Sequence, residues 1–99
     1  MSYTISYQER AIVEYETAME WYRLRSEQAA VNFEIAIKEK IDPLRATSGT
    51  FKRSYKQFHE VSLKRYPFSI VYLIDEKRKT VIISSIFHHK RNPRLKYGQ

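Results

Sequence analysis

The stretch that decides the fold is residues 58–97, which reads FHEVSLKRYPFSIVYLIDEKRKTVIISSIFHHKRNPRLKY. Segments rich in β-branched and aromatic residues lie at 58–65, 68–75 and 79–88, and polar or proline-containing breaks separate them. Such segments are typical of β-strands, and connections this short favour antiparallel neighbours. We therefore expect an antiparallel sheet, followed by a tail rich in His, Lys, Arg and Tyr.

The last of these expected strands is apolar at both alternating sets of positions. Because both sets are largely apolar at mid-strand, we expect this strand to be central and at least partly covered on both faces. Strict alternation divides it into Val81, Ile83, Ser85 and Phe87 on one face, and Ile82, Ser84, Ile86 and His88 on the other.

The first half of the chain predicts a short strand followed by a helix. Tyr3, Ile5 and Tyr7 alternate with polar residues, which is a strand pattern. Ser6 and Glu9 have the spacing of a capping box, which starts a helix by satisfying its free N–H groups. We expect this helix to end near residues 24–25. Its expected apolar stripe is Ile12, Tyr15, Ala18, Met19 and Tyr22, and its expected outer positions include Glu14, Glu16 and Glu20.

A second helix is predicted to follow directly. Ser26 is a plausible N-cap, and Pro43 should end or kink the helix because proline lacks a backbone N–H. Residues 46–57 read as a loop. The expected apolar stripe is Ala29, Ala30, Phe33, Ile37, Ile41 and Leu44, and we expect Trp21, Tyr22 and Phe33 to belong to the core.

These segments combine into one α+β fold. The expected order is β-α-α-β-β-β, in which an N-terminal strand and a helical hairpin pack on an antiparallel sheet. The length of 99 residues fits one domain, covering residues 1–99.

Charge is distributed unevenly along the chain. Residues 51–99 hold twelve Lys or Arg and three Asp or Glu, a balance of +9. Residues 1–50 hold six and eight, a balance of −2, so the net charge of +7 is concentrated on the expected sheet. A basic region with few acids among its cations favours a polyanionic partner such as RNA.

Several classes of protein are disfavoured by the composition. The chain has no cysteine, so disulfides and thiolate metal sites are excluded, and we expect no metal and no cofactor. No apolar run approaches the roughly 20 residues that span a bilayer, and the N-terminus lacks the pattern of a secretory signal. We therefore expect a cytoplasmic protein without a membrane partner.

Two motifs in this order of elements resemble the RelE/ParE superfamily of type II toxin–antitoxin toxins, the plasmid stabilisation type. Residues 63–72, LKRYPFSIVY, match the family's L-x-R/K-F/Y-P-Y/F-x-I-x-Y, and residues 88–93, HHKRNP, match H-x-x-R-x-P. The likeness spans almost the whole chain. It implies a toxin that a cognate antitoxin neutralises. It also implies one of two activities: ribosome-dependent cleavage of mRNA, or non-enzymatic inhibition of DNA gyrase.

The tail holds the candidate residues for RNA cleavage, which needs a base, an acid and a cation to stabilise the phosphorane. Arg91 and Tyr97 match the terminal arginine and tyrosine of the RelE nuclease pattern. We expect Arg91 to contact the phosphorane, with Tyr97 and either His88 or His89 in the proton steps, His88 being the first choice. The candidate RNA-binding cations are Lys64, Arg65, Lys90 and Arg94.

The chain also departs from the nuclease pattern. Nuclease members carry two lysines where this chain has Glu60 and Ser62, and an arginine where it has Ser69. The loss of these cations would weaken phosphorane stabilisation, which favours the gyrase inhibitor. Arg91 could instead form an ion pair that fixes the tail. Our first hypothesis is a ribosome-dependent, metal-independent endoribonuclease, with a gyrase inhibitor and a toxin fold that has lost activity as alternatives.

Overall fold

The structure is a computed structural model that describes residues 2–46, 53–55 and 57–97, and for residues 53–55 it describes the backbone. It confirms the expected order of elements and adds a short strand, β2, within the expected loop. The elements are β1 (Thr4–Tyr7), α1 (Glu9–Arg23), α2 (Glu27–Ile41), the 3-10 turn η1 (Asp42–Arg45), β2 (Arg53–Tyr55), β3 (Phe58–Ser62), β4 (Phe68–Asp75), β5 (Thr80–His88) and the 3-10 turn η2 (Pro93–Leu95).

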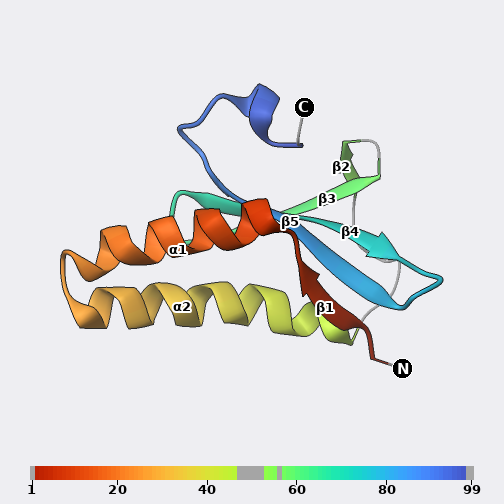
Figure 1. Cartoon of the computed structure of the whole chain (residues 1–99), viewed down its shortest axis with the longest axis horizontal. Helices are drawn as coiled ribbons and strands as arrows, with labels where there is room; N and C mark the ends of the chain where they lie inside the picture. The colour runs from red at the N-terminus through yellow and green to blue at the C-terminus, as the bar shows by residue number, and fades with distance from the viewer. Residues whose placement is uncertain (1, 47–52, 56, 98–99) are drawn as a thin grey trace.

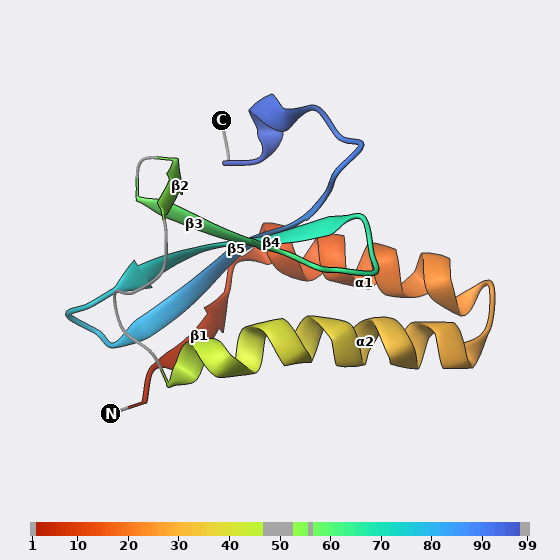
Figure 2. The ribbon, with the colours of Figure 1, turned by 180° about the vertical axis from the view of Figure 1, so that it is seen from behind.

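The strands form one five-stranded sheet in the order β1-β5-β4-β3-β2. The pairs β2–β3, β3–β4 and β4–β5 are antiparallel as expected, whereas β1 runs parallel to β5. Both helices cover one face of the sheet, and the C-terminal segment lies on the opposite side (Figures 1 and 2). The expectation that β5 is an inner strand with cover on both sides is therefore confirmed.

The sequence predicted the start of α2 correctly and the N-cap of α1 incorrectly. Ser26 caps α2 as expected, because its Oγ accepts the Ala29 N–H at 2.9 Å. The Ser6 capping box is wrong, because Ser6 lies inside β1, paired with Ile82. The N-cap of α1 is Gln8, whose side chain makes no capping hydrogen bond.

The core lies between the helical hairpin and the sheet. Phe33 of α2 is fully buried at its centre, with ring centroids of Tyr22 and Phe68 at 4.8 Å and 5.2 Å. Trp21 is not a core residue, and 51% of it is exposed. It precedes the inward-facing Tyr22 by one residue, about 100° around the helix, so it lies on the flank of α1.

A β-bulge corrects the expected facing of residues in β5. Tyr72 pairs with Ile83 but the preceding Val71 pairs with Ser85, so Ser84 is an extra residue. Past the bulge the alternation is reversed, and Ile86 joins the core. Phe87 consequently lies on the face opposite the helices.

Candidate functional site

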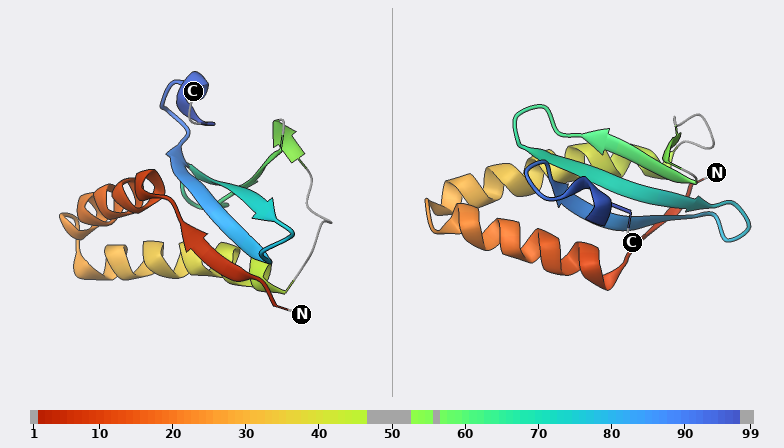
Figure 3. Two further views of the ribbon diagram at one scale, coloured as in Figure 1. Left: turned by 45° about the vertical axis from the view of Figure 1, so that its right-hand side comes forward. Right: turned by 90° about the horizontal axis from the view of Figure 1, so that it is seen from above.

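The C-terminal segment, residues 89–97, crosses the sheet face that the helices leave uncovered (Figure 3). Its first residue is fixed to the β3–β4 turn, since the His89 N–H donates to the Pro67 carbonyl at 2.8 Å. Further along, the guanidinium of Arg91 and the ammonium of Lys96 lie 5.2 Å and 5.6 Å from the Phe87 ring centroid. These contacts leave Phe87 only 1% exposed.

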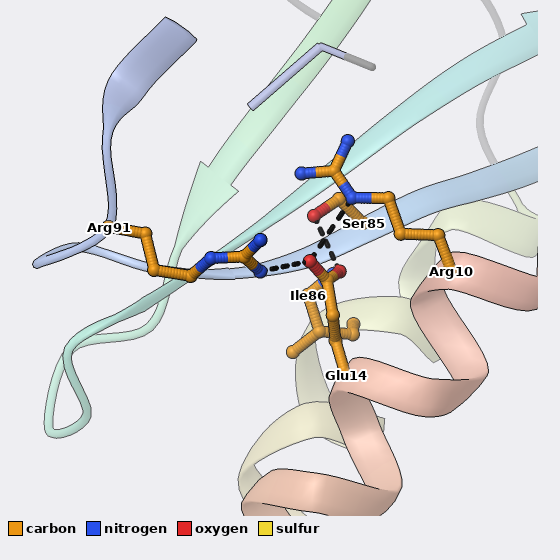
Figure 4. A network of polar contacts seen from close by, with 5 residues as sticks. All are labelled: Arg10, Glu14, Ser85, Ile86 and Arg91. Atoms are coloured by element: carbon orange, nitrogen blue, oxygen red, sulfur yellow. Dashed lines mark hydrogen bonds and ion pairs between the residues drawn. The ribbon is translucent and has the colours of Figure 1, made fainter. Parts of the chain in front are cut away.

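One carboxylate, that of Glu14 on α1, connects this segment to the helical layer (Figure 4). Its Oε1 accepts the Ile86 N–H at 3.0 Å and the Ser85 hydroxyl at 2.7 Å. Its Oε2 accepts from Arg10 Nε at 3.1 Å and from Arg91 Nη1 at 2.5 Å. We call these five residues the Glu14 network.

The need for Glu14 follows from the sheet topology. β1 pairs with β5 only as far as Ile83, so within the described strands the Ile86 N–H on that edge has no strand partner. An unpaired backbone N–H in a buried position is costly, and the Glu14 carboxylate removes that cost. Sequence reasoning placed Glu14 facing outward, which is wrong: its side chain is 11% exposed. No local pattern reveals this, because Ile86 is 72 residues away.

A second carboxylate, Glu60 on β3, holds the end of the segment. It accepts the Tyr97 hydroxyl and the Lys96 ammonium, each at 3.0 Å. The rings of Phe58 and Tyr97 also pack, with centroids 5.1 Å apart. Arg91 and Tyr97, the two residues matched to the nuclease pattern, are thus each bound to a carboxylate, and the two carboxylates lie on different elements.

His88 and His89 occupy different surroundings. Nδ1 of His88 accepts the Lys90 N–H at 3.0 Å, so the neutral ring carries its proton on Nε2. Burial, together with the charges of Lys90, His89 and Arg91, lowers the pKa of His88 below its ordinary value of 6.5. The neutral form therefore predominates at pH 7, and its one basic nitrogen, Nδ1, is already occupied by the Lys90 N–H.

His89 takes part in a chain of hydrogen bonds instead. Its Nε2 lies 2.8 Å from the hydroxyl of Ser69, which lies 2.9 Å from the hydroxyl of Ser62. Ser69 is 1% exposed, so this chain fastens the start of the segment to β4. Ser69 and Ser62 are two of the positions where the nuclease pattern has cations.

The four candidate RNA-binding cations differ from Arg91 in having no acidic partner within the part of the chain that the structure describes. None of them forms an ion pair with another described residue, and all four are exposed. Two lie in the β3–β4 turn, and the His89–Pro67 hydrogen bond brings a third beside that turn. They are Lys64, Arg65, Lys90 and Arg94.

A groove of about 1170 Å³ lies between α1, the β3–β4 turn and the C-terminal segment, and we call it the α1 groove. Its lining is mainly apolar and includes Val13, Trp21 and Leu95, which are exposed. Arg10 and Arg91 line it as well. Among the described residues, no group of three or more His, Asp or Glu side chains could hold a metal ion. No described helix has the length and hydropathy of a membrane span.

Solved structures show which fold this arrangement belongs to. The chain superposes on a chain of the chromosomal ParDE toxin–antitoxin system of Pseudomonas aeruginosa with a TM-score of 0.73, 20% identity, and coverage of 88% of this chain and 96% of that one. For the isolated RelE toxin of Escherichia coli the TM-score is 0.53, with 15% identity and coverage of 96% and 93%. For the RelBE2 complex of Mycobacterium tuberculosis the values are 0.52, 20%, 89% and 92%.

No curated protein matches the chain in sequence. A family model does match it, that of the ParE toxin of the type II toxin–antitoxin system parDE, over residues 5–93. The matched region runs from the second residue of β1 to the start of η2, and it includes both helices, the other four strands, the Glu14 network and Glu60. The chain therefore belongs to the ParE toxin family of type II toxin–antitoxin systems.

Proposed function

We propose that this toxin acts by binding a protein target, DNA gyrase, and that it does not cut RNA. The observation that carries the proposal is that Arg91 and Tyr97 are each bound to a carboxylate. Cleavage of RNA needs positive charge around the phosphorane. Glu14 already accepts from the Arg91 guanidinium, and Glu60 from the Tyr97 hydroxyl, so the two matched residues are engaged in contacts within the toxin. Gyrase as the target is what the resemblance to ParE-like toxins implies.

We also propose that a cognate antitoxin holds the toxin inactive. The ParDE system of Pseudomonas aeruginosa and the RelBE2 complex are toxin–antitoxin systems with this fold. We expect the antitoxin gene directly beside the gene of this chain. Its product should carry acidic and apolar side chains and bury well over about 1,000 Å² in total. A tight complex in which Arg91 and Lys64 stay fully accessible would contradict this masking.

The test of the target is a DNA cleavage assay with purified components. Gyrase, supercoiled plasmid and the toxin are incubated, and the protein is then denatured to reveal broken DNA. We expect linear plasmid to accumulate with toxin, and to disappear when the antitoxin is added first. Unchanged gyrase activity at a large excess of toxin would contradict the proposal.

A ribosome-dependent nuclease is the second candidate. It is favoured by the four candidate RNA-binding cations, none of which pairs with an acidic residue among those described. Binding of RNA through Lys64, Arg65, Lys90 and Arg94 would weaken steeply between low and physiological salt. Primer extension on mRNA from induced cells would then reveal cuts in the ribosomal A site. Replacing Arg91 by Ala should reduce such cuts on the order of 10²-fold. Cells that express the chain and keep growing would point to a toxin fold without activity.

A further inference from the structure

The two hairpin turns at opposite ends of β4 differ in how their charges are balanced (Figure 3). At the β4–β5 turn, Arg78 pairs with Asp75 at 3.9 Å, and Lys79 pairs with Glu76 at 4.0 Å. The β3–β4 turn, residues 63–67, contains two cations and no acidic residue. Acidic neighbours therefore offset much of the positive charge at one end of the sheet, while the other end keeps it.

Two further cations lie at the end of the sheet that has no acidic residue in its turn. One follows His89, whose N–H donates to the Pro67 carbonyl in the β3–β4 turn. The other precedes Leu95, which lines the α1 groove together with Pro67. All four cations are exposed, and none forms an ion pair with another described residue. We call them the turn cluster: Lys64, Arg65, Lys90 and Arg94.

The β3–β4 turn holds its two cations on a fixed backbone. The Leu63 N–H donates to the Phe68 carbonyl at 2.9 Å, and the Phe68 N–H donates to the Tyr66 carbonyl at 2.8 Å. The Tyr66 ring then packs against the rings of Tyr22 and Phe33, with centroids at 5.5 Å and 5.3 Å. A partner that binds this turn therefore has little backbone to order, which lowers the entropic cost of binding.

The packing of these rings also indicates which kind of polyanion suits the turn. Single-stranded RNA is usually recognised by stacking of its unpaired bases on accessible aromatic rings. The two aromatic residues that flank Pro67 are directed to the core instead: Phe68 is 7% exposed, and Tyr66 packs against the buried cluster. The backbone of duplex DNA requires only cations, and such contacts read no base sequence. Exposed Lys and Arg on a turn whose rings face inward therefore favour a duplex.

We propose that the turn cluster binds the phosphate backbone of duplex DNA, namely the DNA that gyrase holds when the toxin binds to it. The guanidinium groups can each bind two phosphate oxygens, and the ammonium groups act as point charges. The inference rests on the proposed function in one respect, gyrase as the target, and adds DNA as a second contact of the toxin. The toxin should therefore bind gyrase that carries DNA more tightly than gyrase without DNA.

A matched pair of double variants tests the turn cluster. Lys64→Gln with Arg65→Gln removes two exposed cations from the β3–β4 turn, and Lys77→Gln with Arg78→Gln removes two from the β4–β5 turn. Each variant lowers the net charge by two, from +7 to +5, so a general effect of charge is the same in both. Because the four side chains are exposed, both variants should unfold in urea as the wild type does.

The measurement is fluorescence anisotropy of labelled toxin, separated from its co-expressed antitoxin. The four probes are gyrase alone, gyrase assembled on a duplex, the duplex alone, and a single-stranded RNA of the same length. Each affinity is measured at low and at physiological salt.

The variant of the β3–β4 turn should lose affinity only where DNA is present. It should bind the gyrase–DNA complex and the free duplex about tenfold more weakly, and gyrase alone with less than about a twofold change. The slope of log affinity against log salt should fall by about two for the duplex, because each phosphate contact contributes roughly 0.9. The variant of the β4–β5 turn should differ from the wild type by less than about threefold throughout.

Each failure has a different meaning. Equal weakening toward gyrase with and without DNA would place the turn cluster against gyrase itself and overturn the DNA contact. Equal losses in the two variants would show that net charge alone acts, and would overturn the site. Tighter binding of the single-stranded RNA than of the duplex would overturn the inference and favour the nuclease. A toxin that binds the duplex through this turn but does not bind gyrase would overturn the proposed target, and with it the placement of the DNA on gyrase.

Discussion

The two faces of the sheet are covered in different ways. The helical hairpin covers one face with apolar side chains, centred on Phe33, and the contacts are those of an ordinary hydrophobic core. The C-terminal segment covers the other face through two carboxylates, Glu14 and Glu60, and through cations over the Phe87 ring. The first cover depends on non-directional burial, and the second depends on a small number of specific polar contacts.

Arg91 and Tyr97, the two residues matched to the nuclease pattern, belong to the second cover. Their carboxylate partners give them a structural task in the isolated toxin. The four candidate RNA-binding cations, which form no ion pair with another described residue, lie in the β3–β4 turn and in the C-terminal segment.

The largest expected effect concerns the helix-covered face. Phe33→Ala removes a fully buried ring from the centre of the core and should lower the free energy of unfolding by about 3–5 kcal/mol. Urea unfolding monitored by circular dichroism measures this loss. A loss below about 1 kcal/mol would show that the hairpin is not held by apolar burial.

Removal of Glu14 should have the next largest effect, because this residue of α1 contacts both the sheet and the C-terminal segment. Glu14→Ala leaves the Ile86 N–H unpaired and frees Arg91, which should cost about 2–3 kcal/mol. Glu20→Ala is the control: Glu20 is an exposed glutamate of α1 paired with Arg23, and its loss should cost less than about 1 kcal/mol. Equal losses of unfolding free energy in the two variants would show that Glu14 contributes no more to stability than an exposed glutamate.

A smaller effect is expected at the other carboxylate. Glu60→Gln weakens the contacts to Lys96 and Tyr97 and should cost about 1 kcal/mol or less, because these groups are only partly buried. Proteolysis after Lys96 should become faster while the global unfolding transition stays nearly unchanged. A large drop in global stability would mean that the segment and the core unfold as one unit.

The smallest effect is a pH dependence from His88. Its pKa is lowered in the folded state, so the unfolded state binds the proton more readily. This contribution to stability is complete above pH 6.5, the ordinary pKa, and is lost as the pH falls through the lower folded pKa. His88→Gln should therefore flatten the dependence of stability on pH below 6.5. An unchanged slope in chemical unfolding curves would assign the dependence to other groups.

The sequence predicted the helix-covered side of the sheet better than it predicted the contacts between distant segments. Helix periodicity predicted the α2 stripe around Phe33, and the Ser26 cap and the antiparallel strands followed from local signals. The parallel pairing of β1 with β5 could not be predicted locally, because its partners are far apart in the chain. The bulge at Ser84 was also missed, since it preserves the apolar composition of the strand while reversing its faces.

The candidate site was predicted in composition but not in arrangement. The sequence identified the cations, His88 and Tyr97, and it allowed an ion pair for Arg91. It did not identify Glu14 as the partner. Glu14 lies in the same predicted helix as Glu16 and Glu20, and the helical pattern places all three facing solvent. Glu60 was recognised as a departure from the nuclease pattern, while its contacts with Lys96 and Tyr97 depend on how the segment folds back.

Glu14 joins the two covers of the sheet by completing the open edge of β5. The most direct measurement is hydrogen exchange of the Ile86 amide, followed by NMR in the wild type and in Glu14→Ala. We predict that this amide is protected in the wild type and loses its protection selectively in the variant. The Gln8 amide, which donates to the Ile83 carbonyl on the same edge, should keep its protection. Equal protection of the Ile86 amide in both proteins would show that Glu14 does not complete this edge of β5.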